Sequence, residues 1–255
     1  MRQRTSLFTV AERIQGDVPW GSILDAGTGI KSVQWISGLR SSRWTAVSAD
    51  ADHLTSVRSA VATSMRPQDR LILGNWYDPA LLSGDVYETV IADYVVGAIE
   101  GYAPYYQESF FARLRPLIGR RLFVFGVDPY IFGAGNDDTG QAVKQIGRLR
   151  DACALLAGVV PYREFPAEWV VDRLQQSGLR LIFADRFPTV YDQHWIRGQV
   201  SDCRALIARI PDPALAASLE GNAAALEGRA LALCSRLGGL EHGHEYVIVA
   251  EALSG

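Results

Sequence analysis

Short apolar runs alternate with segments of helical apolar spacing over the first half of the chain. The runs are bounded by glycine, proline or acidic residues, which is typical of strands buried in a parallel sheet. After the first run, Val33, Trp35, Ile36 and Leu39 recur at roughly the spacing of a helix. We expect strands at residues 23–24, 44–49, 70–73, 88–94 and 121–126, and helices at 5–15, 54–62 and 105–117.

The second half of the chain is less regular and mostly helical. Its last two apolar runs, at residues 179–184 and 244–250, predict two further strands. The remaining segments with helical spacing are residues 139–157, 166–176, 191–210 and 213–237. The pattern therefore predicts an α/β fold with a doubly wound, mostly parallel sheet of seven strands and a helical insertion between the last two strands.

These boundaries divide the chain into a core at residues 1–187, an insertion at 188–240 and a last core strand at 241–255. Alanine and leucine dominate residues 213–237, so this helix needs a surface to pack against. We interpret the insertion as a substrate cap or as the contact of a homodimer. The short helix at residues 5–15 either packs on the sheet, which we favour, or covers a ligand.

A glycine turn follows the first strand, in the sequence Asp25-Ala26-Gly27-Thr28-Gly29. Glycines let a backbone turn tightly and approach a ligand, and the helix that follows presents free N–H groups. The second strand ends near the acidic residues Asp50 and Asp52. This order of strand, glycine turn, helix, strand and acid is the layout of a nucleotide-binding βαβ unit.

The glycine turn resembles the first motif of class I S-adenosylmethionine (SAM)-dependent methyltransferases, and the family order continues over residues 20–126. The resemblance implies a Rossmann-like fold that binds SAM. The chain departs from the family pattern at three positions. Lys31 stands at the third glycine, Ser48 stands where an acid grips the ribose, and Asn75 replaces the aspartate of the adenine loop.

The resemblance assigns cofactor contacts to several of these residues. Asp25 would accept hydrogen bonds from the ammonium group, directly or through water, although a carboxylate here also caps turns. Gly27, Thr28 and Gly29 would let the backbone pass the methionyl part. Asp50 would take the ribose, whereas Asp52 is expected to cap the next helix.

The loop after the third strand carries the residues expected near the adenine. Asn75 can hydrogen-bond the base, because its amide offers donor and acceptor edges. The neighbouring Trp76 either stacks on the adenine ring or belongs to the core. Lys31 could meet the carboxylate of the ligand, but a solvated lysine is the simpler interpretation.

The acceptor and the reacting methyl group are expected beside Asp93 and Tyr94, where the family places its fourth motif. The next stretch, with Tyr102, Tyr105 and Tyr106, is unusually aromatic and suits a planar or cationic small molecule, unless these rings pack under the following helix. Two further candidates lie far along the chain. Tyr130 is a substrate-binding candidate, and His194 is the best candidate for a general base, since its ordinary pKa lies near neutrality.

Composition narrows the classes of function. The formal net charge is −3, which argues against a nucleic acid partner. The three cysteines are far apart and without metal-like spacing, and no apolar run is long enough for a membrane span. We therefore expect a cytoplasmic protein with reduced thiols and no metal site.

The leading hypothesis is a methyltransferase that uses SAM and acts on a small molecule. The first alternative is an aminopropyltransferase of the spermidine-synthase type, to which Asp93-Tyr94 and the stretch from Tyr105 to Phe111 are loosely similar. The second is a non-catalytic binding or scaffold protein, which the departures at Lys31, Ser48 and Asn75 motivate. We also expect Gly27→Arg to abolish SAM binding without unfolding the chain.

Overall fold

The computed structural model describes residues 6–132 and 137–253. Contacts between Cα atoms group the chain into two units. The first, which we call the sheet unit, holds the described residues of 1–127, 164–186 and 246–255, and the second, the helical unit, holds the described residues of 128–163 and 187–245. The sequence prediction confined the helical addition to residues 188–240, whereas the contacts also assign residues 128–163 to it.

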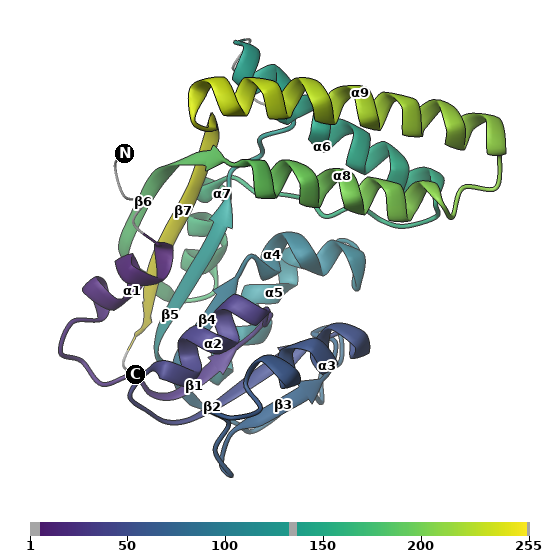
Figure 1. Cartoon of the computed structure of the whole chain (residues 1–255). Helices are drawn as coiled ribbons and strands as arrows, with labels where there is room; N and C mark the ends of the chain where they lie inside the picture. The colour runs from purple at the N-terminus through teal and green to yellow at the C-terminus, as the bar shows by residue number, and fades with distance from the viewer. Residues whose placement is uncertain (1–5, 133–136, 254–255) are drawn as a thin grey trace. The chain divides into compact units, whose positions relative to one another are not determined.

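The seven-stranded sheet has the order β3-β2-β1-β4-β5-β7-β6 (Figure 1). The pairs β2–β3, β1–β2, β1–β4 and β4–β5 are parallel, and β7 is antiparallel. The predicted fold class is therefore confirmed. The strands are β1 (Gly21–Asp25), β2 (Ser41–Ser48), β3 (Arg70–Leu73), β4 (Tyr87–Asp93), β5 (Ile118–Val127), β6 (Leu179–Tyr191) and β7 (Leu240–Ala252).

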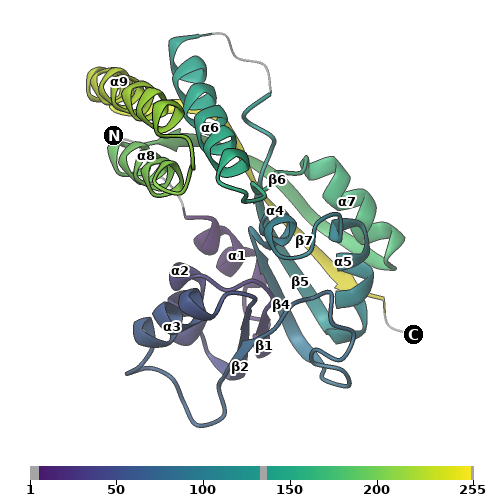
Figure 2. The same ribbon diagram turned by 90° about the vertical axis from the view of Figure 1, so that its right-hand side faces the viewer.

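Helices cover both faces of the sheet within the sheet unit (Figure 2). On one face lie α1 (Leu7–Gln15), α2 (Ile30–Gly38) and α3 (Ala51–Ala60). On the other lie α4 (Val95–Ala98), α5 (Gln107–Leu114) and α7 (Ala167–Gln176), with short 3-10 helices at Ile99–Gly101 and Arg115–Leu117. Strands buried on both faces explain why β1 and β4 read as continuous apolar runs.

Helix α1 packs on the sheet through aromatic contacts. The Phe8 ring stacks on Trp35 of α2 with centroids 4.4 Å apart and lies edge-on to Phe125 of β5 at 5.5 Å. Val10 and Ala11 are fully buried. Aromatic pairs add to the burial of apolar area, so the sheet-packing interpretation of this segment agrees with the contacts.

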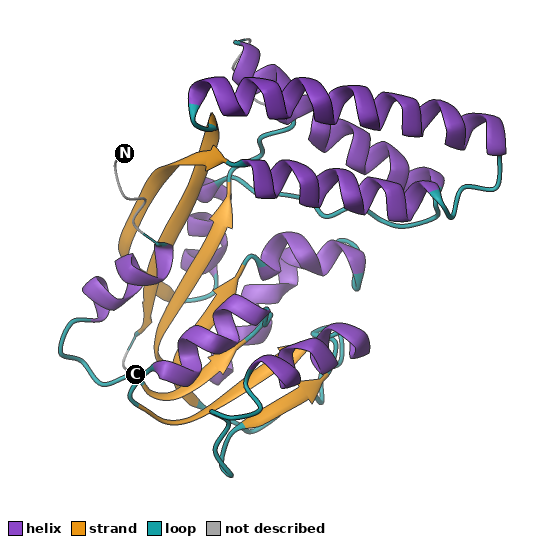
Figure 3. Cartoon of the chain, viewed as in Figure 1, coloured by secondary structure: helices purple, strands orange, loops and turns teal. Residues whose placement is uncertain are grey.

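The helical unit contains α6 (Asp138–Leu156), α8 (Gln193–Ile207) and α9 (Pro213–Leu237), which pack against one another (Figure 3). An aspartate caps each N-terminus through its side chain, namely Asp137, Asp192 and Asp212. Such caps satisfy backbone N–H groups that have no partner within a helix. Among the described residues, no helix is long and apolar enough to cross a membrane.

Candidate functional site

The direction of the strand order reverses between β1 and β4. At such a reversal, open α/β sheets bind ligands beside the carboxyl ends of the strands. The glycine turn begins there, directly after Asp25. Two backbone bonds fix it between neighbouring strands: Ala26 N–H donates to the Ile91 carbonyl at 2.8 Å, and Thr28 N–H to the Val47 carbonyl at 2.9 Å. The chain thus crosses the reversal in a defined conformation.

Asp25 lies fully buried beneath this turn. The Ser32 hydroxyl donates to Asp25 Oδ2 at 2.8 Å and accepts the Gly29 backbone N–H at 2.9 Å, which ties the carboxyl group to the start of α2. Asp25 Oδ1 is buried and has no hydrogen bond of normal geometry with a described residue. A buried carboxylate oxygen without a partner is costly, and this one therefore marks a place where a donor would stabilise the protein.

Burial raises the pKa of Asp25 to about 6. The Ser32 hydroxyl, the Thr28 side chain and the Gly27 backbone favour the ionised form and partly offset this rise in pKa. The group consequently titrates close to neutrality, unlike an exposed aspartate. A cation bound nearby would draw the carboxyl group back to its ionised form.

The two glycines of the turn have different roles. A Cβ at Gly27 would lie 2.4 Å from the Cβ of Val95, the first residue of α4. Val95 therefore leaves no room for a side chain at position 27. A Cβ at Gly29 would meet nothing within 4 Å, and its φ of −125° suits any residue. Gly27 is therefore explained by packing, and Gly29 borders open space. The expectation that Gly27→Arg leaves the fold intact is wrong for this reason.

Asp50 caps α3 after the end of β2. Its Oδ1 accepts the His53 backbone N–H at 2.8 Å, and its Oδ2 accepts the Tyr102 hydroxyl at 3.3 Å. The bond from His53, with a smaller contribution from Tyr102, lowers the pKa of Asp50, so it is ionised at neutral pH. The prediction that Asp52 caps this helix is wrong, because Asp50 occupies the cap and Asp52 lies in the first turn.

Ser48, at the position of the family's acid, is buried at the last residue of β2. Its hydroxyl accepts the Asp50 N–H at 3.1 Å and so shapes the turn into α3. The His53 ring nitrogen Nε2 bonds the Thr28 carbonyl oxygen at 3.0 Å. Since a carbonyl only accepts, Nε2 must carry a proton there. The loops that follow β1 and β2 are thereby joined.

The loop after β3 is joined to the segment after β4 through Asn75. Its Nδ2 donates to the Tyr102 carbonyl at 2.8 Å, and its Oδ1 accepts the Tyr77 N–H at 3.0 Å. Both edges of the amide are thus used within the chain. An aspartate could not make the bond to Tyr102, because a carboxylate has no donor, and this explains the departure from the family pattern.

Trp76 lies in the core rather than at a surface. It is 4% exposed, its Nε1 donates to the Ala26 carbonyl, and its ring meets Phe110 edge-on at 5.9 Å. The indole N–H thus satisfies a backbone carbonyl of the glycine turn. Of the two interpretations of Trp76, the contacts agree with the core residue.

Asp93 ends β4, and Tyr94 follows it in the left-handed region with φ 51°. Tyr105 has φ 66° and is 77% exposed. Left-handed conformations are rare for bulky residues and cluster at functional sites. Both tyrosines were singled out from the sequence, but their strained backbone became visible only in the structure.

Exposed tyrosine rings gather in the loops after β3 and β4. Tyr77 meets Tyr106 edge-on with centroids 5.6 Å apart, and Tyr102 is 40% exposed. Below them, buried Glu100 accepts the Tyr105 N–H at 3.1 Å and the Gln107 side-chain amide at 2.7 Å. The carboxylate of Glu100 therefore holds the segment that carries these rings. No structural role was assigned to Glu100 from the sequence.

The remaining candidates belong to the helical unit and are not placed relative to the residues above. Tyr130 is buried, with its hydroxyl accepting from Arg150 at 2.9 Å and its carbonyl bonded by His242 at 2.9 Å. His194 is exposed at the second residue of α8. The geometry thus supports a structural role for Tyr130 and leaves the role of His194 as a prediction.

Ser32 and His53 are polar residues of this site that the sequence analysis did not assign. Ser32 stands three residues after Gly29, the spacing at which a side chain reaches back to a helix N-cap, so its capping role was readable. The bond between His53 and Thr28 joins residues far apart in sequence and had no local signal.

Among the described residues no group of three or more histidine, cysteine or acidic side chains could hold a metal, and the three cysteines are buried free thiols.

Several solved structures have a fold similar to that of this chain. BH2331 of Bacillus halodurans C-125, a presumed methyltransferase, matches with a TM-score of 0.61 at 11% identity, covering 97% of this chain and 99% of that one. The mycolic acid cyclopropane synthase CmaA1, solved with S-adenosylhomocysteine, matches with a TM-score of 0.53 at 14% identity over 95% and 84% of the two chains. The [4+2]-cyclase SpnF matches with a TM-score of 0.56 at 12% identity over 98% and 81%.

No protein-family model matches the sequence, and no curated protein is similar to it. At these identities the likeness shows the fold alone. The chain therefore has the Rossmann-like fold of class I SAM-dependent methyltransferases, a fold that also serves a cyclase.

Proposed function

We propose that this protein binds SAM at the turn after β1 and transfers its methyl group to a small molecule. The observation that carries the proposal is the buried Asp25, whose Oδ1 forms no hydrogen bond of normal geometry with a described residue, below a glycine turn at the reversal of the strand order. A cationic amino group is the kind of donor that this carboxylate lacks. Because Asp25 is fully buried, that donor would reach it through a bridging water.

The residues present fit a nucleoside with an amino-acid tail. Gly29 borders open space next to the α2 N-terminus, where a carboxylate is favoured by the free N–H groups. The ionised Asp50 keeps acceptor positions for hydroxyl groups beyond its bonds from His53 and Tyr102. One hydrogen of the Asn75 side-chain amide is left to bond the adenine. From the sequence, both the donor and the acceptor edge of this amide were expected to be available.

When bound, SAM would supply an electrophilic methyl group. The task of the chain is then to hold the acceptor in line with that group, which lowers the entropic part of the barrier. Asp93 and Tyr94 lie where β4 ends, and the exposed rings of Tyr102 and Tyr105, with the partly buried Tyr106, supply surface for a planar or cationic acceptor. His194 remains the candidate base for an acceptor that carries a proton.

Calorimetric titration tests the cofactor assignment. We expect SAM and S-adenosylhomocysteine to bind, and Gly29→Val to weaken both at least tenfold with an unchanged melting temperature, because its side chain would enter open space. Gln34→Ala, at an exposed position of the same helix, is the matched control. Equal affinity of Gly29→Val and the wild-type protein would remove the site.

Decarboxylated SAM separates the alternatives. Preference for it over SAM would favour the aminopropyltransferase, since that ligand keeps the ammonium group and lacks the carboxylate. Binding of none of the three ligands would favour a scaffold protein. With SAM bound, methyl transfer from labelled SAM to a panel of small aromatic and amine acceptors tests the reaction itself.

A further inference from the structure

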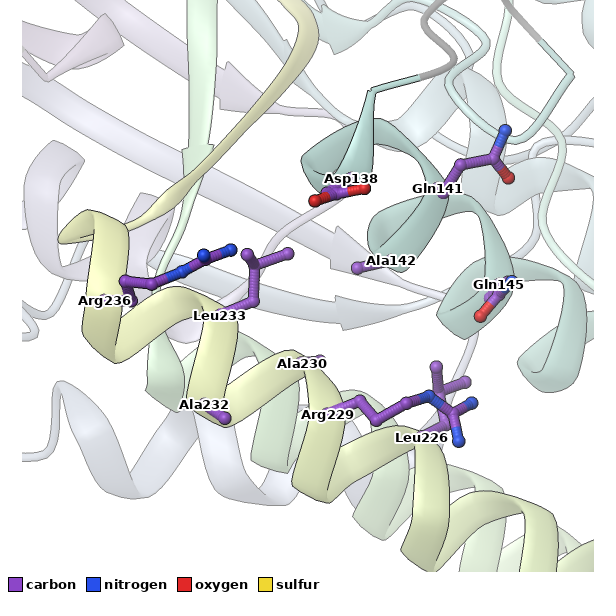
Figure 4. A pocket seen from close by; sticks show the side chains of 10 residues that line it. All are labelled: Asp138, Gln141, Ala142, Gln145, Leu226, Arg229, Ala230, Ala232, Leu233 and Arg236. Carbon is purple, nitrogen blue, oxygen red and sulfur yellow. The ribbon is translucent and has the colours of Figure 1, made fainter.

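A groove with two arginines that form no ion pair with a described residue runs between α6 and α9 in the helical unit. Its main cavity has a volume of about 520 Å³, within the range of small-molecule sites. Figure 4 shows Arg229 and Leu226 of α9 on the side that faces Gln145 of α6, while Arg236 and Leu233 face Asp138. The groove belongs entirely to the helical unit and is separate from the residues assigned to SAM.

The floor of the groove is apolar. Leu226 and Ala230 lie beneath it at 3% and 0% exposure, and the accessible apolar surface comes from the partly exposed Leu233 and Ala142 and from the exposed Ala232. A second cavity of about 460 Å³ shares Gln145, Leu226 and Arg229 with the first and continues along both helices. Arg148 lines this second cavity only, and its guanidinium donates to the Ile131 carbonyl at 3.4 Å. An extended aliphatic chain could lie on this surface and lose its contact with water.

The two basic residues of α9 lie at the rim of the groove. Neither Arg229 nor Arg236 forms an ion pair with any residue that the structure describes, whereas Arg204 on the neighbouring α8 pairs with Glu220 at 2.8 Å and Glu227 at 3.0 Å. The two guanidinium groups stand seven residues apart, about 10 Å along the helix. The main cavity therefore carries two positive charges against the single carboxylate of Asp138.

We propose that this groove binds a monocarboxylate with an aliphatic body. One excess positive charge matches one negative charge, and a guanidinium receives a carboxylate through two parallel hydrogen bonds. Arg229 is the head-group residue, because Asp138 stands across from Arg236 and Gln145, a neutral donor, stands across from Arg229. The aliphatic body lies along Leu233, Ala142 and Ala232, the lining residues with accessible apolar surface.

Titration of the full chain with decanoate, below its aggregation threshold, tests the proposal. We expect saturable binding that weakens at least tenfold in Arg229→Gln and less in Arg236→Gln. Arg209→Gln, an exposed arginine outside the groove, is the matched control and should bind like the wild-type protein. Both arginines of the groove are exposed, so these variants are expected to keep the wild-type melting temperature.

Three further ligands complete the test. Decyltrimethylammonium has the same chain with the opposite charge, decyl phosphate carries more charge, and acetate has a carboxylate without the chain; each should bind more weakly than decanoate. The proposal is overturned by equal affinity of decanoate for Arg229→Gln and wild type, by equal binding of the cationic ligand, or by no saturation up to about 1 mM. SAM affinity of Arg229→Gln should be unchanged, which separates this site from the proposed cofactor site.

Discussion

The carboxyl ends of β1, β2 and β4 and the three long helices of the helical unit use polar residues in different ways. At the strand ends, buried or ionised groups such as Asp25 and Asp50 bond defined atoms of neighbouring loops. In the helical unit, aspartates cap helices, and most charges lie at exposed positions. Burial of the Asp25 carboxylate costs folding free energy, and the bonds at the strand ends join the loops to one another. In the helical unit the aspartates satisfy backbone N–H groups at the helix N-termini.

The largest effect that tests this contrast is expected at Gly27. A Cβ there would lie 2.4 Å from the Val95 Cβ, so Gly27→Ala should lower the free energy of unfolding by about 3 kcal/mol. Gly29→Ala, which meets no atom within 4 Å, should lie within about 1 kcal/mol of wild type. Urea unfolding of the two variants makes the comparison, and equal stabilities would contradict the packing role of Gly27.

The next effect concerns the charge of Asp25. Its pKa rises from 3.8 to about 6 on folding, so the native state binds more protons between these values. The penalty is absent below pH 3.8 and is complete above pH 6, at about 3 kcal/mol. Asp25→Asn should therefore be more stable than wild type by about 2 kcal/mol at pH 8, and the difference should vanish near pH 4.

Thermal unfolding of this pair across pH 4–8 measures the Asp25 effect. A difference between the proteins that stays constant over this range would show that the charge is not the cause. If the proposed function holds, Asp25→Asn should also lose SAM affinity. The pair would then show a functional group that is retained at a cost in stability.

A smaller effect isolates the left-handed backbone of Tyr105. Tyr105→Gly and Tyr105→Ala both remove the ring, but only glycine adopts φ 66° without strain. The glycine variant should be more stable than the alanine variant by about 1 kcal/mol. Both should lose turnover equally if the ring binds the acceptor. A more stable alanine variant would contradict the strained conformation.

A similar magnitude is expected for the bond between the loops after β3 and β4. Asn75→Asp removes the donor to the Tyr102 carbonyl and places two acceptors face to face, which should cost about 1 kcal/mol. Asp78→Asn in the same loop keeps an acceptor for the Ala80 N–H and serves as the control. Hydrogen exchange of residues 99–106 should accelerate in Asn75→Asp alone; unchanged exchange would show that Asn75 does not hold this segment.

The smallest effect belongs to the helical unit. Arg204 pairs with Glu220 and Glu227 at partly exposed positions, so Arg204→Gln should change the free energy of unfolding by about 0.5 kcal/mol. The loss should fall further at high salt, because exposed ion pairs are screened. A loss as large as that of Gly27→Ala would remove the contrast between the two regions.

The sequence by itself determined the order of elements and the place of the glycine turn. Apolar runs, helical spacing and turn residues are local features of the sequence. Because of this, β3 at Arg70–Leu73 and α9 at Pro213–Leu237 were predicted with the bounds that the structure has. The ends of the apolar runs also predict where the strands end. Because parallel strands end at the same edge of a sheet, Asp25, Asp50 and Asp93 were expected at one edge. The grouping of residues 128–163 with the later helices was not readable, since it depends on packing between distant segments.

Only the tertiary structure decided what each polar side chain bonds. The clash partner of Gly27 is Val95, the partner of Asn75 is Tyr102, and the partner of His53 is Thr28. These contacts join residues many positions apart, and no local pattern encodes them. Burial acts in the same way: the pKa of Asp25 and the core position of Trp76 follow from how tightly distant segments enclose them, which the local sequence does not specify.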